Sequence, residues 1–128
     1  MPTVALSTRD DVSSEMEQIR TFIERWKTCW ENNKLEEYIK CYSDDFMIKG
    51  IDKQGWKKFK RSLSKKYKNI KVTFKNTEID IKEGGKKAEV SLLQYYRSDQ
   101  YSDEGLKTLI LKKEKRKWRI VRENWKPL

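Results

Sequence analysis

Residues 86–101 show the clearest alternation of the chain, and one face of this predicted strand is apolar until it ends in two polar side chains. Side chains alternate between the two faces of a strand, so every second residue lies on the same side. One face of this stretch carries three apolar residues followed by two polar ones: Ala88, Val90, Leu92, Gln94 and Tyr96. An apolar core that opens toward an amide and a phenol is typical of a small-molecule site. The stretch therefore predicts a pocket at this end of the strand.

Four further residues are predicted to complete this ligand pocket. Neighbouring predicted strands contribute two charged side chains, Lys107 and Glu123, and predicted helices contribute two aromatic ones, Tyr42 and Trp56. Together they give an aromatic hollow with a few polar groups. The alternative is a closed core in which the polar groups satisfy one another and the backbone, because buried polar groups are normally paired. The sequence leaves both interpretations open.

Side chains that bind metals or carry out nucleophilic catalysis are scarce. The chain has no histidine, which removes Ser-His and Cys-His nucleophiles and the usual ligand of zinc, iron and copper. Cys29 and Cys41 are predicted to be buried apolar residues in helices, with a disulfide between them as the alternative. The acidic loops at 44–45 and 99–104 lack the spacing of a calcium site. The sequence predicts no metal site and no cofactor.

Positive charge is concentrated between residues 53 and 75. This stretch contains ten Lys or Arg and no acid, and the whole chain has a net charge of +10. Such a surface attracts anionic polymers, nucleic acid among them, with an affinity that falls with salt. The predicted polyanion patch consists of six residues: Lys57, Lys58, Lys60, Arg61, Lys65 and Lys66. The alternative is a solvated helix surface, because the aromatic residues between them have core spacing and not that of a base-stacking platform.

The length and composition indicate one domain. A chain of 128 residues can bury a single core. Because only 36% of the residues are hydrophobic and 39% are charged, five Trp, six Tyr and four Phe must supply much of the buried surface. No apolar run approaches the roughly 20 residues that span a bilayer, and no signal-peptide pattern opens the chain. Residues 1–13 are predicted to be a disordered lead-in, and residues 14–128 a single domain.

Three helices are predicted before the main strands. A capping box from Ser14 to Glu17 begins the first helix, whose apolar residues recur at three- and four-residue steps as far as residues 32–33. A short helix follows over residues 35–42. After a brief strand at 46–49, the third helix begins at Asp52, which has the residue type of an N-cap.

Four long antiparallel strands are predicted to follow, over residues 70–81, 86–101, 106–113 and 118–125. Gly84 and Gly85 suit a tight hairpin turn between the first two. Within 70–81 the apolar positions change parity, which indicates a β-bulge near Asn76, and a bulge curves a sheet. The predicted fold is therefore α+β, a cone in which three N-terminal helices pack on a curved antiparallel sheet.

The outer face of this sheet is expected to expose apolar side chains, namely Leu93, Tyr95, Ile110 and Val121. Exposed patches of this kind often mark association surfaces. We expect a homodimer through this outer face, or contact with a covalently linked neighbouring domain in a longer protein.

Several short motifs occur in a distinctive order along the chain. They include Trp26-Lys27-x-x-Trp30, Tyr38-x-x-x-Tyr42-Ser43-x-x-Phe46, the run from Gln94 to Asp99, and Trp118-x-Ile120-x-x-Glu123-x-Trp125. Their order and spacing resemble the nuclear transport factor 2-like superfamily, and more narrowly the accessory domain appended to bacterial L,D-transpeptidases. The resemblance implies a cone with a pocket between helices and sheet. It also implies a non-catalytic ligand- or partner-binding module in cell-wall remodelling, periplasmic or otherwise associated with the envelope.

Enzymes built on this fold supply an alternative, a small-molecule isomerase or lyase of the ketosteroid isomerase type. Such a site needs a carboxylate base and an oxyanion donor in an apolar pocket. Glu123 would be the base, with Tyr96 or Tyr42 as the donor. This alternative rests on analogy of fold.

Overall fold

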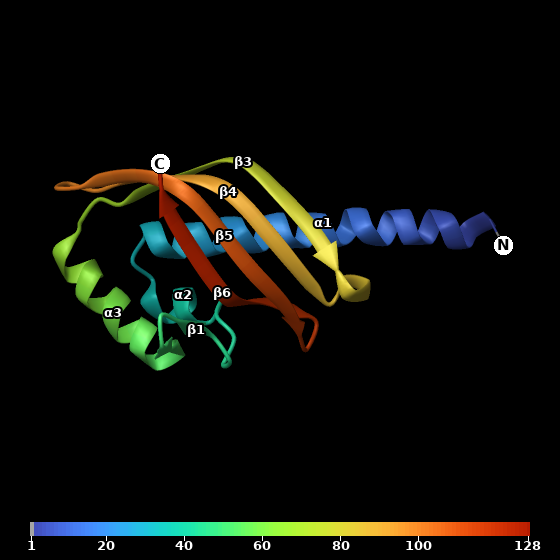
Figure 1. The fold of residues 1–128 in the computed structure, drawn as a ribbon, viewed down its shortest axis with the longest axis horizontal. Coiled ribbons are helices and arrows are strands. Elements are labelled where there is room, and N and C mark those ends of the chain that lie inside the picture. The colour runs from blue at the N-terminus through green and yellow to red at the C-terminus, as the bar shows by residue number, and fades with distance from the viewer. Residues whose placement is uncertain (1) are drawn as a thin grey trace.

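The computed structural model describes residues 2–128, with side chains from residue 13 onward. Within that range it confirms the predicted α+β cone, in which helices cover the concave side of one curved antiparallel sheet (Figure 1). The helices are α1 (Pro2–Glu31), α2 (Leu35–Ile39) and α3 (Lys53–Lys66), and a 3₁₀ turn, η1, spans Glu83–Gly85. The main strands are β3 (Lys71–Lys82), β4 (Lys87–Arg97), β5 (Ser102–Glu114) and β6 (Lys117–Pro127), in sequence order.

Helix α1 lies across the sheet and supplies much of the core. Its apolar stripe buries Ile19, Ile23 and Trp26, and each such side chain contributes on the order of 1.5–3 kcal/mol when fully buried. The prediction that this helix begins at a capping box at Ser14 is wrong, because the backbone is already helical from Pro2. The predicted disorder of residues 1–13 stays a prediction, and the side chains of residues 2–12 lie outside the described ones.

The curvature of the sheet arises where the sequence predicted it. The register between β3 and β4 shifts between Lys75 and Glu78, and Asn76 at the bulge adopts a positive φ of 53°. A second shift, which the sequence did not indicate, falls between Ile110 and Leu111 where β5 meets β6. The two irregularities bend the sheet around the helices, since a bulge increases the local twist of its strand.

The turn between β3 and β4 also agrees with the prediction. Gly84 and Gly85 adopt φ values of 64° and 88°, which glycine reaches without steric cost. The predicted limits of the next two strands are wrong. β4 ends at Arg97 because Ser98 donates its backbone N–H to the Tyr101 carbonyl at 2.8 Å, which closes a turn. β5 therefore begins at Ser102, before the predicted start at Leu106.

The segment after α2 joins the helices to the sheet. Ser43 donates its N–H to the Ile120 carbonyl at 2.9 Å, and Ile120 donates to the Cys41 carbonyl at 2.8 Å. These two bonds draw the backbone away from helical geometry. For this reason α2 ends at Ile39 and not at Tyr42 as predicted.

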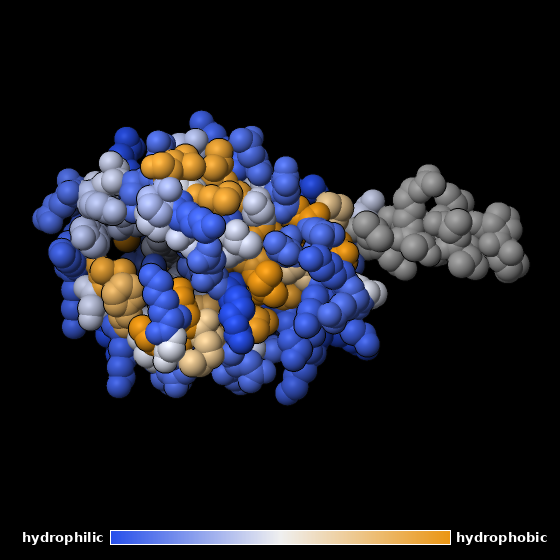
Figure 2. Space-filling model, in the orientation of Figure 1, coloured by the Kyte–Doolittle hydropathy of each residue, from blue (hydrophilic) through white to orange (hydrophobic). Residues whose placement is uncertain are grey.

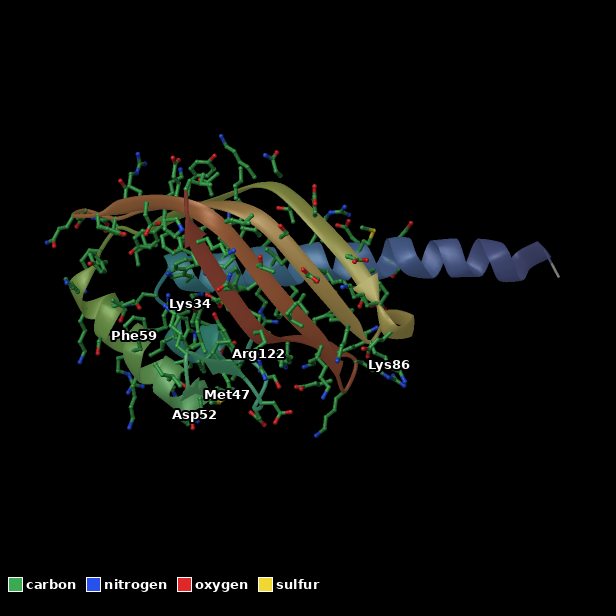
Figure 3. The ribbon with its side chains drawn as sticks, viewed as in Figure 1. Lys34, Met47, Asp52, Phe59, Lys86 and Arg122 are labelled. Atoms are coloured by element: carbon green, nitrogen blue, oxygen red, sulfur yellow. The ribbon has the colours of Figure 1, made fainter. Side chains whose placement is uncertain are left out.

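A small hairpin leads into α3. Its strands are β1 (Met47–Ile48), which falls within the predicted brief strand, and β2 (Ile51–Asp52), which the sequence did not predict. The Asp52 carboxylate accepts a hydrogen bond from the Gly55 N–H at 2.9 Å, so the predicted N-cap is confirmed. Figure 3 shows Met47 and Asp52 together at this end of the helix.

The outer face of the sheet bears the apolar residues expected there. Leu93, Tyr95, Ile110 and Val121 are partly exposed, and Leu106 beside Leu93 is 37% exposed. The homodimer through this face stays a prediction. None of the helices in residues 2–128 is both long enough and apolar enough to cross a membrane.

The cap at Asp52 gives a first testable prediction. Asp52→Ala should lower the free energy of unfolding by about 1 kcal/mol, because the Gly55 N–H loses its acceptor. Asp44→Ala is the control, since the Asp44 side chain is 97% exposed and makes only a surface ion pair with Lys53. Urea denaturation would measure both changes, and equal losses would contradict the capping role.

Candidate functional site

A cavity of about 400 Å³ lies between the helices and the sheet, within the size range of small-molecule pockets. We call it the cone pocket. Five of the six residues predicted for the ligand pocket line its wall: Trp56, Gln94, Tyr96, Lys107 and Glu123. The sixth, Tyr42, is buried behind the wall and bonds to Glu123. Figure 2 shows apolar surface exposed over α3 among hydrophilic residues, and Phe59 in the middle of that helix (Figure 3) is 47% exposed.

A buried ion pair forms the floor of the cone pocket. The Lys107 ammonium donates to the Glu123 carboxylate at 2.7 Å, and the two side chains are only 6% and 4% exposed. Glu123 pairs with Leu109 across the β5–β6 ladder, so Lys107 is its diagonal neighbour on the same face. Two unpaired charges at this depth would be very costly, and each ion depends on the other.

Tyr42 completes the hydrogen bonding of Glu123, and two further aromatic side chains bond to Tyr42. Tyr42 donates its hydroxyl to Glu123 Oε1 at 2.7 Å. Because that proton is committed to the carboxylate, the Tyr42 oxygen accepts from its other neighbours, the Tyr38 hydroxyl at 2.7 Å and Trp26 Nε1 at 3.1 Å. We call this set the Glu123 network. It joins α1, α2 and the segment after α2 to strands β5 and β6.

The network fixes the charge of Glu123. Burial alone would raise the pKa of this carboxyl, but the Lys107 ammonium, the Tyr42 hydroxyl and the Lys60 charge together hold it below its ordinary value. Burial, with the neighbouring Glu123 charge, raises the pKa of Tyr42 and of Tyr38 well above the ordinary value. The floor is therefore an ionised carboxylate with neutral phenols.

Lys60 is the main difference from the sequence prediction. It was assigned to the surface polyanion patch, yet its side chain lines the cone pocket. Its ammonium lies 4.5 Å from the centre of the Trp30 ring, 5.3 Å from that of Trp56 and 5.4 Å from that of Tyr38. Trp56 and Lys60 are four residues apart, one helical turn, and so share the inward face of α3.

The charge of Lys60 is not matched by an adjacent carboxylate. Among residues 13–128 it makes no ion pair within 4 Å, whereas Lys107 is paired with Glu123. Burial lowers the pKa of Lys60 to about 8, which Glu123 partly opposes and Lys107 reinforces. The pocket thus contains one neutralised lysine and one lysine free to meet a ligand.

The rest of the polyanion patch lies outside the pocket. Lys57 and Arg61 reach Glu36 at 2.9 and 4.0 Å, and Lys58, Lys65 and Lys66 are exposed. These residues form the outward face of α3. Their binding of polyanions stays a prediction.

Several residues of the pocket wall were not predicted. Trp30 stacks on Tyr96 with ring centroids 5.7 Å apart, and Tyr67 and Tyr101 lie beside Tyr96 at 6.5 and 6.2 Å. Trp125 also lines the pocket, over Gly105. A Cβ on Gly105 would lie 2.6 Å from Trp125 Nε1, so glycine there makes room for the indole. The sequence did hold a signal for two of these residues, because Trp30 and Trp125 lie near the ends of the first helix and the last strand.

Four polar atoms of the wall lack partners among the described residues. They are Trp56 Nε1, Gln94 Oε1, Asp103 Oδ1 and Trp125 Nε1. Buried polar groups are normally satisfied, and Gln94 is only 4% exposed. The closed-core interpretation required these groups to satisfy one another, and for the amide oxygen of Gln94 they do not.

Metal ligands and thiols offer no comparable site. Within the described residues no three His, Cys, Asp or Glu side chains gather as a metal ion would require. Cys29 and Cys41 are free and buried, as predicted, and burial raises the pKa of the Cys41 thiol to about 11.

The ion pair gives a prediction of stability. Lys107→Met should lower the free energy of unfolding by about 3–5 kcal/mol, because it leaves Glu123 buried without its cation. The double variant Lys107→Met, Glu123→Leu should recover part of that loss, since no buried charge is left unpaired and only the Tyr42 hydroxyl loses its acceptor. Urea denaturation at pH 7 would measure both. A double variant as unstable as the single one would contradict this account.

The same pair predicts an acid dependence. The folded pKa of Glu123 lies below its ordinary value of 4.5, so the stability from its ionised form is complete above that value and is lost as pH falls through the folded pKa. The Glu123→Gln variant has no carboxylate at this position and so lacks this pH-dependent part of the stability. The difference in unfolding free energy between wild type and Glu123→Gln should therefore shrink between pH 6 and pH 3, whereas a constant difference would exclude an ionised Glu123.

Comparison with known proteins identifies the family. Residues 18–124 match the Cds6 C-terminal NTF2-like domain, where NTF2 denotes nuclear transport factor 2. Bd1075 of Bdellovibrio bacteriovorus is 32% identical with a TM-score of 0.81, over 88% of this chain and 40% of Bd1075. Pgp2 of Campylobacter jejuni, a helical cell shape determining protein, is 20% identical with a TM-score of 0.77, over 86% of this chain and 40% of the crystallised K307A variant.

Other similar structures show the fold alone. A Streptomyces avermitilis protein of the NTF2-like family, provisionally assigned as a dehydratase, is 9% identical with a TM-score of 0.78, over 91% of this chain and 98% of its own. No functionally curated protein gives a significant match. This chain spans about 40% of the length of Bd1075 and of Pgp2. From the match over residues 18–124, the chain belongs to the Cds6 C-terminal NTF2-like domain family.

Proposed function

We propose that this chain is a non-catalytic ligand-binding module whose cone pocket holds an anionic ligand, with cell-wall material as the ligand class. The observation that carries the proposal is Lys60, a cation inside an aromatic pocket without a carboxylate partner among residues 13–128. A ligand carboxylate would supply the missing partner, and charge-assisted hydrogen bonds of this kind are the strong ones.

The remaining wall suits the rest of such a ligand. The rings of Trp30, Trp56 and Tyr96 offer flat apolar surfaces, while Gln94 and Trp125 offer an acceptor and a donor without partners. Peptidoglycan combines carboxylates with sugar rings and amides, which match these three features. The shape-determining role in the name of Pgp2 also supports a cell-wall ligand.

The isomerase alternative is less well supported by this site. A general base must accept a proton, and an effective one has a pKa near the working pH. The pKa of Glu123 is instead held below its ordinary value, and both carboxylate oxygens already accept hydrogen bonds from Lys107 and Tyr42. Glu123 is therefore better suited to holding the pocket together than to removing protons.

Sedimentation with purified peptidoglycan sacculi would test the proposed function. Wild-type protein should co-sediment at moderate salt, and duplex DNA should not compete. Lys60→Met should weaken retention about tenfold or more, because a hydrogen bond to a charged group contributes about 1.5–3 kcal/mol. Lys58→Met is the matched control, the same change on the exposed side of the helix. Equal effects of the two variants would reject the pocket as the binding site.

A second candidate function is polyanion binding by the exposed face of α3. It is favoured by four exposed cations on one helix, namely Lys58, Arg61, Lys65 and Lys66. Changing all four to Glu should abolish binding to duplex DNA at low salt, measured by fluorescence anisotropy. The same variant should keep sacculus binding at moderate salt. Loss of both activities together would merge the two candidate sites into one.

A further inference from the structure

The environment of Lys60 supports chemistry as well as ion pairing. Its ammonium sits among the rings of Trp30, Trp56 and Tyr38 at 4.5–5.4 Å, in a cavity of about 400 Å³. We propose that Lys60 forms a reversible imine with an aldehyde or ketone ligand that enters the cone pocket. This inference rests on the same cavity as the proposed function, but it does not depend on a cell-wall ligand.

The first requirement is an amine that is free to react. Lys107, the other lysine of the pocket, is held by the Glu123 carboxylate at 2.7 Å. Lys60 makes no ion pair within 4 Å among residues 13–128. Desolvation in an apolar pocket activates a lysine amine toward carbonyl groups. Lys60 has this feature, since the rings of Trp30, Trp56 and Tyr38 surround its ammonium.

The second requirement is a supply of neutral amine. Burial lowers the pKa of Lys60 to about 8. Against the ordinary value of 10.5 for a lysine, this makes the neutral fraction at pH 7 much larger. The rings favour the protonated amine to some extent, because cations are attracted to aromatic faces. They favour the protonated imine for the same reason, so the product is stabilised as well.

The chemistry balances without an oxidant or reductant. The lone pair of Lys60 Nζ attacks the carbonyl carbon, and the electrons of the C=O π bond move to oxygen. A proton passes from nitrogen to that oxygen, which gives a carbinolamine. Loss of the hydroxyl with a second proton releases water and forms the C=N bond. Protonation of the nitrogen then gives an iminium cation, which faces the three rings and lies within the field of Glu123.

The walls also indicate the class of carbonyl compound. Trp30 and Tyr96 present stacked rings 5.7 Å apart, and Phe59 on α3 is exposed beside the pocket. A planar aromatic aldehyde would lie against these surfaces and bring its carbonyl carbon toward Lys60. An unsubstituted benzaldehyde is small enough for the cavity and is a suitable probe.

Reductive trapping tests the proposal on the wild-type protein. The protein is incubated at pH 7 with benzaldehyde and sodium cyanoborohydride, whose hydride converts the iminium to a stable secondary amine. Peptide mapping by mass spectrometry then gives the rate of labelling at each lysine. Lys60 should be labelled at least about tenfold faster than exposed Lys58, because its neutral fraction is larger. Equal or slower labelling of Lys60 would overturn the proposal.

Two controls make the result specific. Lys60→Arg keeps the positive charge and cannot form an imine, so the fast labelling should disappear while the rates at other lysines stay unchanged. The second control is sedimentation of unlabelled protein with sacculi, which tests the proposed cell-wall ligand separately from the imine. Fast labelling without sacculus binding would reject the proposed cell-wall ligand and leave the imine in place. Sacculus binding with equal labelling of all lysines would reject the imine and leave the proposed cell-wall ligand in place.

Discussion

The Glu123 carboxylate, ionised and almost wholly buried, is the constraint on which the rest of this domain depends. Moving such a charge out of water costs several kcal/mol even after the protein relaxes. The cost is offset because Lys107 and Tyr42 reach the carboxylate, with Trp26 and Tyr38 behind Tyr42. These groups come from three separate parts of the chain. The helices and the sheet must therefore be correctly placed before the charge is satisfied, which couples the layers of the fold.

The same arrangement explains why the two lysines of the pocket differ. Lys107 points from the sheet and is neutralised at the floor, where it holds Glu123. Lys60 comes from a helix, is half-buried, and its ammonium lies near the rings of three aromatic side chains. Strands β5 and β6 thus carry the ion pair of Lys107 and Glu123, and α3 carries Lys60, which has no ion pair among residues 13–128. The result is a polar floor below aromatic walls, with a cavity of about 400 Å³ between them.

Much of the fold could be predicted because its signals are local. Alternation along β4 placed Gln94 and Tyr96 on the face that carries the buried Val90 and Leu92, and a change of parity located the bulge at Asn76. The short polar side chain of Asp52 identified its helix start. The predicted end of α2 was wrong because it depends on backbone bonds to a distant segment, those of Ile120. The predicted end of β4 was wrong because the turn closed by Ser98 and Tyr101 has no glycine or proline to mark it.

The candidate site was less predictable, for a related reason. The predicted pocket residues lie on strand faces or apolar helix stripes, where local periodicity determines which side a residue occupies. Lys60 follows Trp56 by one helical turn and so shares its face, but the charge of a lysine favours solvent, as it does for the other cations of α3. The rings that surround its ammonium include Trp30 and Tyr38, which belong to other helices. The pairing of Tyr42 with Glu123, 81 residues away, likewise depends on tertiary structure.

Three of the five tryptophans, Trp30, Trp56 and Trp125, line the cone pocket. Indole emission responds to the polarity and charge of its surroundings, and these rings lie beside Lys60, Gln94 and the buried ion pair. The domain therefore carries its own optical reporter. Entry of a ligand would change the colour and intensity of intrinsic fluorescence without an attached dye, and libraries of unlabelled compounds could be screened against the native protein in solution.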